Sequence, residues 1–230
     1  MRLSVVVPVL DEAAGIADAL HALQALRTRG HEVIVVDGGS RDATQALAQP
    51  LADRVVVSPR GRATQMNAGA RVAHGEALLF LHADTRLPDN ALAGLEQALQ
   101  HRAWGRFDVT IAGRSRWLPL VAAMMNLRSR LTGIATGDQA MFATRAAFDA
   151  AGGFPEQPLM EDIELSKRLK RIGPPAALRA RATTSGRRWD THGAWRTILL
   201  MWRLRFDYWR GVPAERLAAR YYANVSRPNA

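Results

Sequence analysis

The chain has 230 residues, with 31 lysines and arginines against 21 aspartates and glutamates, a formal net charge of +10 and a pI of about 11.2. This length suffices for one α/β domain with a sizeable core, and the basic excess favours an anionic partner such as a nucleotide, a nucleic acid or an acidic lipid. Cysteine is absent, which excludes disulfide bonds and thiolate metal sites and favours a reducing compartment.

The sequence predicts neither a membrane-spanning helix nor a signal peptide. The longest apolar stretch, Trp117 to Met125, is interrupted by Pro119 and falls short of the roughly 18–20 residues that a membrane span needs. The apolar run from Leu3 to Leu10 leads directly into Asp11 and Glu12 without a small-residue cleavage site, so we interpret it as a strand. We therefore expect a cytoplasmic protein.

The first hundred residues alternate between strand and helix patterns. Short apolar, β-branched runs predict buried strands at 3–10, 33–36, 54–57 and 77–81. Helical spacing of apolar residues predicts helices at 15–29, 43–48 and 90–100, and a Gly/Arg loop at 58–61 leads into another helix. Strand–helix–strand units of this spacing form a parallel sheet. A helix that begins in such a loop attracts phosphate through its free N–H groups.

The second half has a less regular order. Its pattern predicts strands at 104–112, 140–142 and 177–184, and helices at 115–131, 145–151 and 161–171. A C-terminal amphipathic helix at 195–210 carries an apolar stripe of Trp195, Ile198, Leu199, Trp202, Phe206 and Trp209, beside Arg196, Arg203 and Arg210. Two interpretations of this stripe remain open: contact with an anionic membrane surface, or packing on the same domain or a second subunit.

Acidic residues follow three of the predicted strands. Glu12, Asp37 and Asp84 come directly after apolar runs, and the carboxyl ends of parallel strands share one edge, where α/β sheets bind ligands. Asp84 suits Mg²⁺ or Mn²⁺, which prefer carboxylate oxygens and can hold a diphosphate. Each residue alone could be a solvated turn aspartate or glutamate. Together they predict a nucleotide site.

A second acidic pair, Glu161 and Asp162, begins the helix at 161–171. Acids in a first turn can simply complement the helix dipole. Alternatively, one of these carboxylates is a general base for an incoming hydroxyl.

Other nucleotide-binding motifs are missing. The spacing G-x-G-x-x-G after the first strand is absent, which argues against an NAD enzyme, and there is no Walker-A pattern. Two alternatives to a transferase stay open: a non-catalytic RNA- or polyanion-binding protein, favoured by the charge, and a sugar nucleotidyltransferase. The first would carry basic runs interleaved with aromatics, whereas these arginines are scattered, so nucleic acid is not expected as a partner. The second would have a Gly-rich loop where Asp11-Glu12 stands.

The chain resembles a family 2 glycosyltransferase with a GT-A fold. The matching motifs are Val5 to Glu12, Val36 to Asp42, Phe80 to Asp84 and Met160 to Asp162, in the family's order over residues 1–190. Within the family, the stretches 60–70 and 185–189 resemble a small bacterial subgroup without assigned substrates.

This resemblance implies an α/β catalytic domain over residues 1–190 and a helical extension over 191–230. Residues 1–100 would bind the nucleotide and 101–190 the acceptor. The residues expected near the donor are Pro8, Leu10, Glu12, Asp37, Gly38, Ser40, Asp42, Arg60, Arg62, Gln65, Asn67, His82, Ala83, Arg187, Arg188 and Trp189.

The resemblance also implies the chemistry. Asp84, with His82, would hold a divalent cation, Asp162 with neighbouring Glu161 would be catalytic, and Asp138 with Gln139 would face the acceptor. Histidine replaces the first aspartate of the family's usual Asp-x-Asp metal motif and brings less negative charge, so arginines would carry more of the diphosphate. The implied function is inverting transfer of a sugar from a UDP- or GDP-linked donor to a hydroxyl. The C-terminal helix, rather than the resemblance, is the basis for expecting an acceptor on a lipid or isoprenoid carrier, and for a protein that is peripheral on the inner membrane face or a homodimer.

Overall fold

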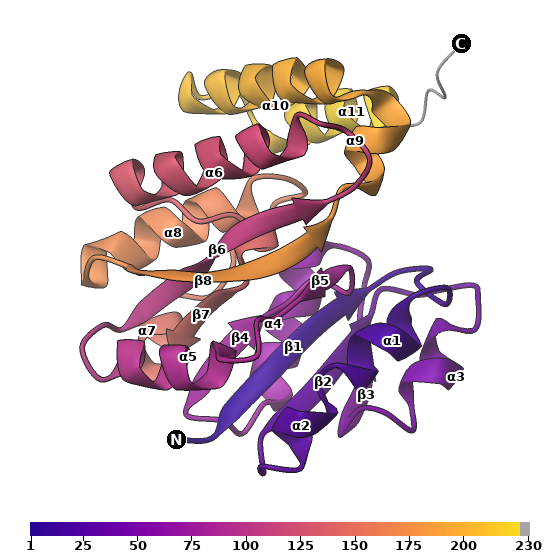
Figure 1. Ribbon diagram of the computed structural model, residues 1–230, viewed down its shortest axis with the longest axis vertical. Helices are drawn as coiled ribbons and strands as arrows, with labels where there is room; N and C mark the ends of the chain where they lie inside the picture. The colour runs from indigo at the N-terminus through magenta and orange to yellow at the C-terminus, as the bar shows by residue number, and fades with distance from the viewer. Residues whose placement is uncertain (226–230) are drawn as a thin grey trace.

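The computed structural model describes residues 1–225, without the side chains of Arg188, His192, Ala194 and residues 224–225. One eight-stranded sheet runs through the molecule in the order β3-β2-β1-β4-β7-β6-β8-β5, with helices on both faces (Figure 1). The predicted α/β class with a mostly parallel sheet is confirmed.

The first four strands form the parallel part of the sheet. They are β1 (Leu3–Val9), β2 (Glu32–Asp37), β3 (Arg54–Val57) and β4 (Ala77–Phe80), each within one residue of its predicted bounds. β1 lies between β2 and β4, pairing Val6 with both Ile34 and Phe80. These three strands therefore end at one edge, as the sequence predicts.

The helix predicted at 15–29 is divided into α1 (Ile16–His21) and α2 (Gln24–Arg27). The side-chain amide of Gln24 donates to the carbonyl oxygens of Leu20 (2.8 Å) and Leu51 (2.9 Å). In a continuous helix the Leu20 carbonyl would accept from the backbone N–H of Gln24. Instead, the side-chain amide of Gln24 donates to this carbonyl. Its second hydrogen bond, to Leu51, connects the break between α1 and α2 to the segment that follows the helix Thr44–Ala48.

The sheet continues with strands of mixed direction. β7 (Met141–Thr144) runs antiparallel between β4 and β6 (Trp104–Ala112), and β8 (Ala176–Ser185) runs parallel to β6. The two-residue strand β5 (Thr85–Arg86) pairs with β8, in a segment that the sequence predicts only as a turn. The remaining elements of this part are α3 (Thr44–Ala48), α4 (Arg62–Val72), α5 (Ala91–Leu99), α6 (Leu118–Thr132), η1 (Gly137–Gln139), α7 (Arg145–Ala150), α8 (Glu161–Ile172) and α9 (Arg187–His192).

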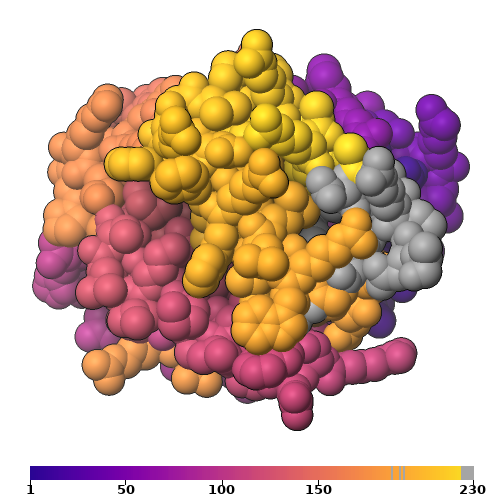
Figure 2. All heavy atoms as spheres, turned by 90° about the horizontal axis from the view of Figure 1, so that it is seen from above, coloured from indigo at the N-terminus to yellow at the C-terminus, as the bar shows by residue number. Residues whose placement is uncertain are grey.

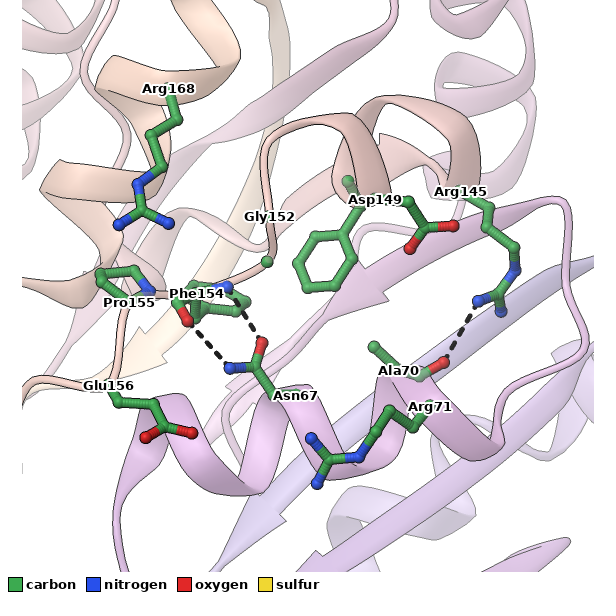
Figure 3. A pocket seen from close by; sticks show the side chains of 12 residues that line it. Asn67, Ala70, Arg71, Arg145, Asp149, Gly152, Phe154, Pro155, Glu156 and Arg168 are labelled. Carbon is green, nitrogen blue, oxygen red and sulfur yellow. Dashed lines mark hydrogen bonds between the residues drawn. The ribbon is translucent and has the colours of Figure 1, made fainter.

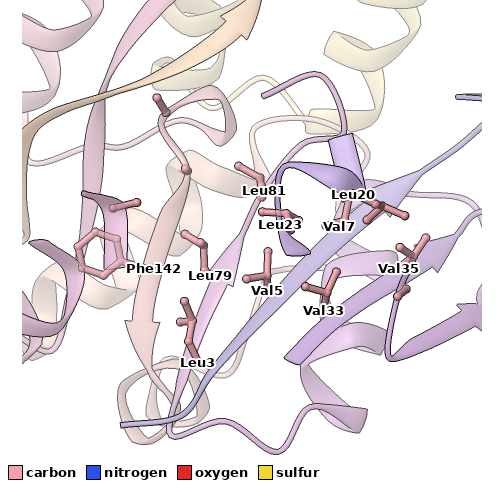
Figure 4. Packing of buried hydrophobic residues seen from close by; sticks show 14 of the residues in the cluster. Leu3, Val5, Val7, Leu20, Leu23, Val33, Val35, Leu79, Leu81 and Phe142 are labelled. Carbon is pink, nitrogen blue, oxygen red and sulfur yellow. The ribbon is translucent and has the colours of Figure 1, made fainter. Parts of the chain in front are cut away.

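Two hydrophobic clusters cover the two faces of the sheet. Val5, Val7, Leu20 and Leu79 belong to the cluster on the α1 side (Figure 4). On the opposite face, α4 lies so close to the sheet that a Cβ on Gly69 would be 2.4 Å from Cγ1 of Val6. Only glycine fits at this close approach, which brings the C-terminal half of α4 against Val6 of β1 and Val36 of β2.

The C-terminal helices α10 (Ala194–Trp209) and α11 (Ala214–Val225) pack on the segment that leads into α8. Leu204 of α10 and Leu217 of α11 are buried against Met160 and Ile163. The predicted apolar stripe of α10 lies on its other face and is exposed, from 54% for Phe206 to 80% for Trp209, except for Ile198, which is partly buried. Among the described residues, no helix combines the length and apolar character that crossing a membrane requires.

Candidate active site

The loops that follow β1 and β2 hold each other in place. The backbone N–H of Asp11 donates to Oγ of Ser40 (2.9 Å), and the N–H of Arg41 donates to Oδ1 of Asp11 (2.8 Å). Asp42 accepts from the N–H of Ala13 (3.0 Å) and from the hydroxyl of Thr44. The acidic residues at this edge are thus positioned by short local contacts that need no ligand.

Asp37 is completely buried beneath these loops. Its Oδ2 accepts from the N–H groups of Gly39 and Ser40 (2.9 Å each) and from Nε2 of Gln45 (2.7 Å), and its Oδ1 accepts from the Ser40 hydroxyl. Burial alone would raise the pKa of Asp37, but these hydrogen bonds outweigh it and lower the pKa below its usual value. The buried carboxylate of Asp37 therefore holds the loop after β2 in place through hydrogen bonds to Gly39 and Ser40.

Gln65 has a similar supporting position. Its Nε2 donates to the carbonyl oxygens of Val9 and Val36 (2.8 Å each), the last residue of β1 and the last but one of β2. A Cβ on Gly38 would lie 3.0 Å from this amide, so the glycine gives it room. Both residues belong to the set expected near the donor, and here they link the two strand ends.

The exposed rim of the edge consists of Glu12, Asp84 and Arg187. Nη2 of Arg187, in α9, lies 3.7 Å from Oε2 of Glu12, and the N–H of Ser185 donates to the backbone carbonyl of Asp84 (3.1 Å). Burial raises the pKa of Glu12, Arg187 opposes this, and the negative charge of Asp84 adds to it. Residues 12, 84 and 187, far apart in sequence, therefore share one site.

A second cluster lies beside this rim, around η1. Nδ1 of His82 is 3.5 Å from Oδ1 of Asp138, and the N–H of Gly137 donates to Oδ2 of Asp162 (2.9 Å). A Cβ on Gly137 would lie 2.5 Å from the His82 ring, so glycine is required there. Gly137 is not among the residues predicted from the sequence, although a glycine directly before Asp138 is a signal for such close approach.

The two carboxylates at the start of α8 differ in environment. Glu161 is buried, and its Oε1 lies 4.0 Å from Nη1 of Arg62. Burial raises the pKa of Glu161, Asp162 adds to this effect and Arg62 opposes it. Asp162 is partly exposed, and its Oδ1 accepts from the N–H of Ile163 (2.7 Å). Asp162 is therefore the more accessible of the two.

Of the remaining predicted site residues, four are at least partly exposed and one, Gln139, is buried. Pro8, Leu10 and Ala83 are partly exposed at the strand ends, and Arg60 is exposed in its loop. Gln139 is completely buried, with Oε1 accepting from the N–H of Thr136 (3.2 Å), so it shapes η1 from inside.

Trp189 and Asn67 do not lie at the rim. Trp189 packs partly buried against a cluster on α6, and the side chain of Arg188 lies outside the described residues. Asn67 exchanges hydrogen bonds with the backbone of Phe154 (2.8 and 2.9 Å) and lines a pocket of about 510 Å³ between α4, α7 and α8 (Figure 3). This pocket shares only Asn67 with the expected donor residues.

The residues at the rim fit a divalent cation that is bound together with a diphosphate. Within the part of the chain that the structure describes, no three histidine, aspartate or glutamate side chains gather as a metal cage. Asp84 is exposed at the edge, and Mg²⁺ is commonly held by one or two carboxylates with substrate phosphates completing its shell. His82 is turned toward Asp138, which favours Asp84 as the protein ligand.

The fold is the GT-A fold of glycosyltransferases. The chain is similar to Staphylococcus aureus TarS solved with UDP-GlcNAc (20% identity, TM-score 0.64, 80% of this chain and 58% of that one). It is also similar to the mannosyltransferase PcManGT of Pyrobaculum calidifontis solved with GDP-Man and Mn²⁺ (24% identity, TM-score 0.61, 79% and 56%). Residues 4–149 match the family described as Glycosyl transferase family 2. The chain belongs to this family.

Among curated relatives, the chain is 30% identical over 152 residues to undecaprenyl-phosphate 4-deoxy-4-formamido-L-arabinose transferase of Pseudomonas aeruginosa. This match covers 59% of the chain and 44% of the relative. A glycosyltransferase of PGL/p-HBAD biosynthesis in Mycobacterium tuberculosis is 33% identical over 91 residues, 36% of each protein. The chain thus spans less than half the length of these relatives.

Proposed function

We propose that this protein is an inverting glycosyltransferase that moves a sugar from a UDP- or GDP-linked donor to an acceptor hydroxyl. The observation that carries the proposal is the convergence of Asp84, Glu12 and Arg187 on one rim, with the accessible carboxylate of Asp162 in the adjoining cluster. Solved proteins of the same fold hold UDP-GlcNAc or GDP-Man, which supports a nucleotide-sugar donor.

The chain's own residues would act on two sides of the sugar. Arg187, and the exposed Arg60 and Arg62, would neutralise the donor's diphosphate. Asp84 would hold a Mg²⁺ or Mn²⁺ ion, which when bound stabilises the charge that develops on the leaving diphosphate. Asp162 would accept the proton of the acceptor hydroxyl as its oxygen bonds to the anomeric carbon and the bond to the diphosphate breaks. A single displacement of this kind inverts the anomeric centre.

A thermal-shift panel of nucleotide sugars tests this function. We expect one nucleotide-sugar class to raise the melting temperature in the presence of Mn²⁺ more than in its absence, because Asp84 would hold the ion and the ion would supply positive charge for the diphosphate. The same donor should then give a sugar product of inverted configuration with a suitable acceptor. If no nucleotide or nucleotide sugar binds with or without metal, the proposed function is wrong.

The exposed face of α6 and α10 supports a peripheral position on an anionic membrane. α10 exposes Trp195, Leu199, Trp202, Phe206 and Trp209, and neighbouring α6 exposes Leu120, Met124, Leu127 and Leu131. The rings of Trp117 and Trp195 are in contact, with their centroids 5.1 Å apart. On this face of the molecule the α10 segment, in orange to yellow, adjoins the α6 segment, in rose (Figure 2). Arg196, Arg203 and Arg210 are exposed on the same helix, α10. We propose that this α6–α10 face contacts the inner membrane surface, where the acceptor's carrier would lie.

We expect the protein to co-sediment with vesicles containing anionic phospholipid, more weakly at high salt and with zwitterionic vesicles. A Trp202→Glu and Trp209→Glu double variant should lose this binding because it places negative charge on the apolar stripe. Leu47→Glu, at an exposed position of α3, serves as the matched control. Absence of salt-sensitive binding, with a dimer in sedimentation velocity that the double variant abolishes, would assign the face to a second subunit instead.

A further inference from the structure

Arg128 of α6 and Arg205 of α10 form a pair of like charges beside the candidate base. Burial and the charge of Arg205 lower the pKa of Arg128 to about 10, and Asp162 opposes that shift. Nε and Nη2 of Arg128 and Nε of Arg205 are buried and have no hydrogen-bond partner among the described residues. Two cations thus lie together with part of their donor capacity unused.

Two other arginines, Arg145 and Arg130, have partners within the protein, whereas Arg106 pairs through Nη1 and leaves its buried Nε without a partner among the described residues. Arg145 donates to the carbonyl oxygens of Ala70 (3.2 Å), Ala73 (2.8 Å) and Gly75 (3.0 Å). Arg130, two residues after Arg128, pairs with Asp108 at 2.7 Å, and Arg106 donates to the same carboxylate. Asp108 is therefore already shared by two arginines. Unpaired buried charge is costly, so a fold that keeps Arg128 and Arg205 side by side is suited to receive an anion.

We propose that Arg128 and Arg205 bind a phosphate group of the acceptor, so that the acceptor's hydroxyl is held near Asp162. A phosphate offers several oxygens to two guanidinium forks and carries enough negative charge to neutralise both. The inference rests on the proposed function, in which Asp162 is the base.

The position of the pair favours the acceptor over the donor. In the proposed function the donor's diphosphate would lie at the ends of β1 and β4, where Arg187 and a cation held by Asp84 would neutralise it. Arg128 instead lies on α6, in the half of the chain expected to bind the acceptor. The outer sides of the same two helices form the exposed α6–α10 face. A phosphate with an apolar tail could therefore contact the two arginines with its phosphate and this face with its tail.

The test is calorimetric titration of phosphate probes into protein saturated with Mg²⁺ and the nucleotide identified by the thermal-shift panel. The probes are inorganic phosphate and geranyl phosphate. We expect Arg128→Met and Arg205→Met to weaken binding of both probes by about 10- to 100-fold, the usual value of a charged hydrogen bond. Arg216→Met, an exposed arginine on α11, should bind like the wild type.

A second readout separates binding from a structural role. Without ligand, each methionine variant should melt at or above the wild-type temperature, by up to roughly 2–4 °C, because one of two repelling buried charges is gone. Variants that melt lower and bind phosphate like the wild type would overturn the proposal. Tighter binding of geranyl phosphate than inorganic phosphate would support a lipid-linked acceptor, and equal binding a soluble phosphorylated one.

A failure of the proposed function can be distinguished from a failure of the phosphate site, because the two depend on different ligands. If the wild type binds no nucleotide, the same titration is carried out without nucleotide. Phosphate binding that disappears in both methionine variants would then support an anion site, whereas wild-type protein that binds neither probe would overturn it.

Discussion

The variant Asp162→Asn is expected to lose transferase activity while keeping its donor. Asparagine has nearly the same shape, and its amide oxygen can still accept from the N–H of Gly137, so η1 should stay in place. It cannot take a proton, however, and a positioned general base contributes about 10²–10⁴-fold to a rate. We therefore expect kcat to fall by that factor, with nucleotide affinity and melting temperature close to wild type.

Two further variants make this test specific to Asp162. Glu164→Gln, two residues further along α8, should retain activity, because Glu164 pairs with Lys167 on the helix surface at 3.3 Å. Glu161→Gln tests the neighbouring carboxylate, which is only 5% exposed. Undiminished turnover in Asp162→Asn, together with loss in Glu161→Gln, would transfer the role of base to Glu161.

The variant Asp84→Asn is expected to remove the benefit of a divalent cation. Asp84 is the exposed carboxylate of the rim, and a metal held there contributes several kcal/mol of charge stabilisation at the leaving group. We expect activity to fall by about 10²-fold or more, and nucleotide affinity to become insensitive to added Mn²⁺. Binding measured by calorimetry, with and without Mn²⁺, is the direct measurement.

Asp89→Asn, an exposed aspartate in the loop after β5, is the matched control and should keep the wild-type response to metal. A variant at position 84 that responds to Mn²⁺ like the wild type would show that the cation is held elsewhere, and His82 would then be the next candidate to substitute.

The sequence predicted most strands because their burial pattern is local. Uninterrupted apolar runs such as Val33 to Val36 can only lie inside a sheet, and a run that ends in an acid identifies the ligand edge. The grouping of Glu12 and Asp84 also follows, because it requires only that β1 and β4 are parallel neighbours. Family resemblance added Asp162, whose position beside Gly137 is a long-range contact.

Roles that depend on the direction of a side chain were not predictable. Gln65 and Gln139 look like exposed polar residues in the sequence, yet each is buried and bonded to backbone groups whose availability depends on how strands and turns end. The same holds for Gln24, which divides the first helix. Arg128 and Arg205 are 77 residues apart in the sequence. They come close only because α10 packs over the segment before α8.

The position of strand β7 limits how the two halves of the chain could move relative to each other. Its hydrogen bonds to β4 on one side and β6 on the other make the two halves of the chain parts of one sheet. A hinge rotation between these halves would have to break the backbone ladder between Ala77–Phe80 and Met141–Thr144. If the protein closes on a donor as proposed, we therefore expect the movement to be confined to small peripheral segments, such as the short helix that carries Arg187, and not to involve the sheet.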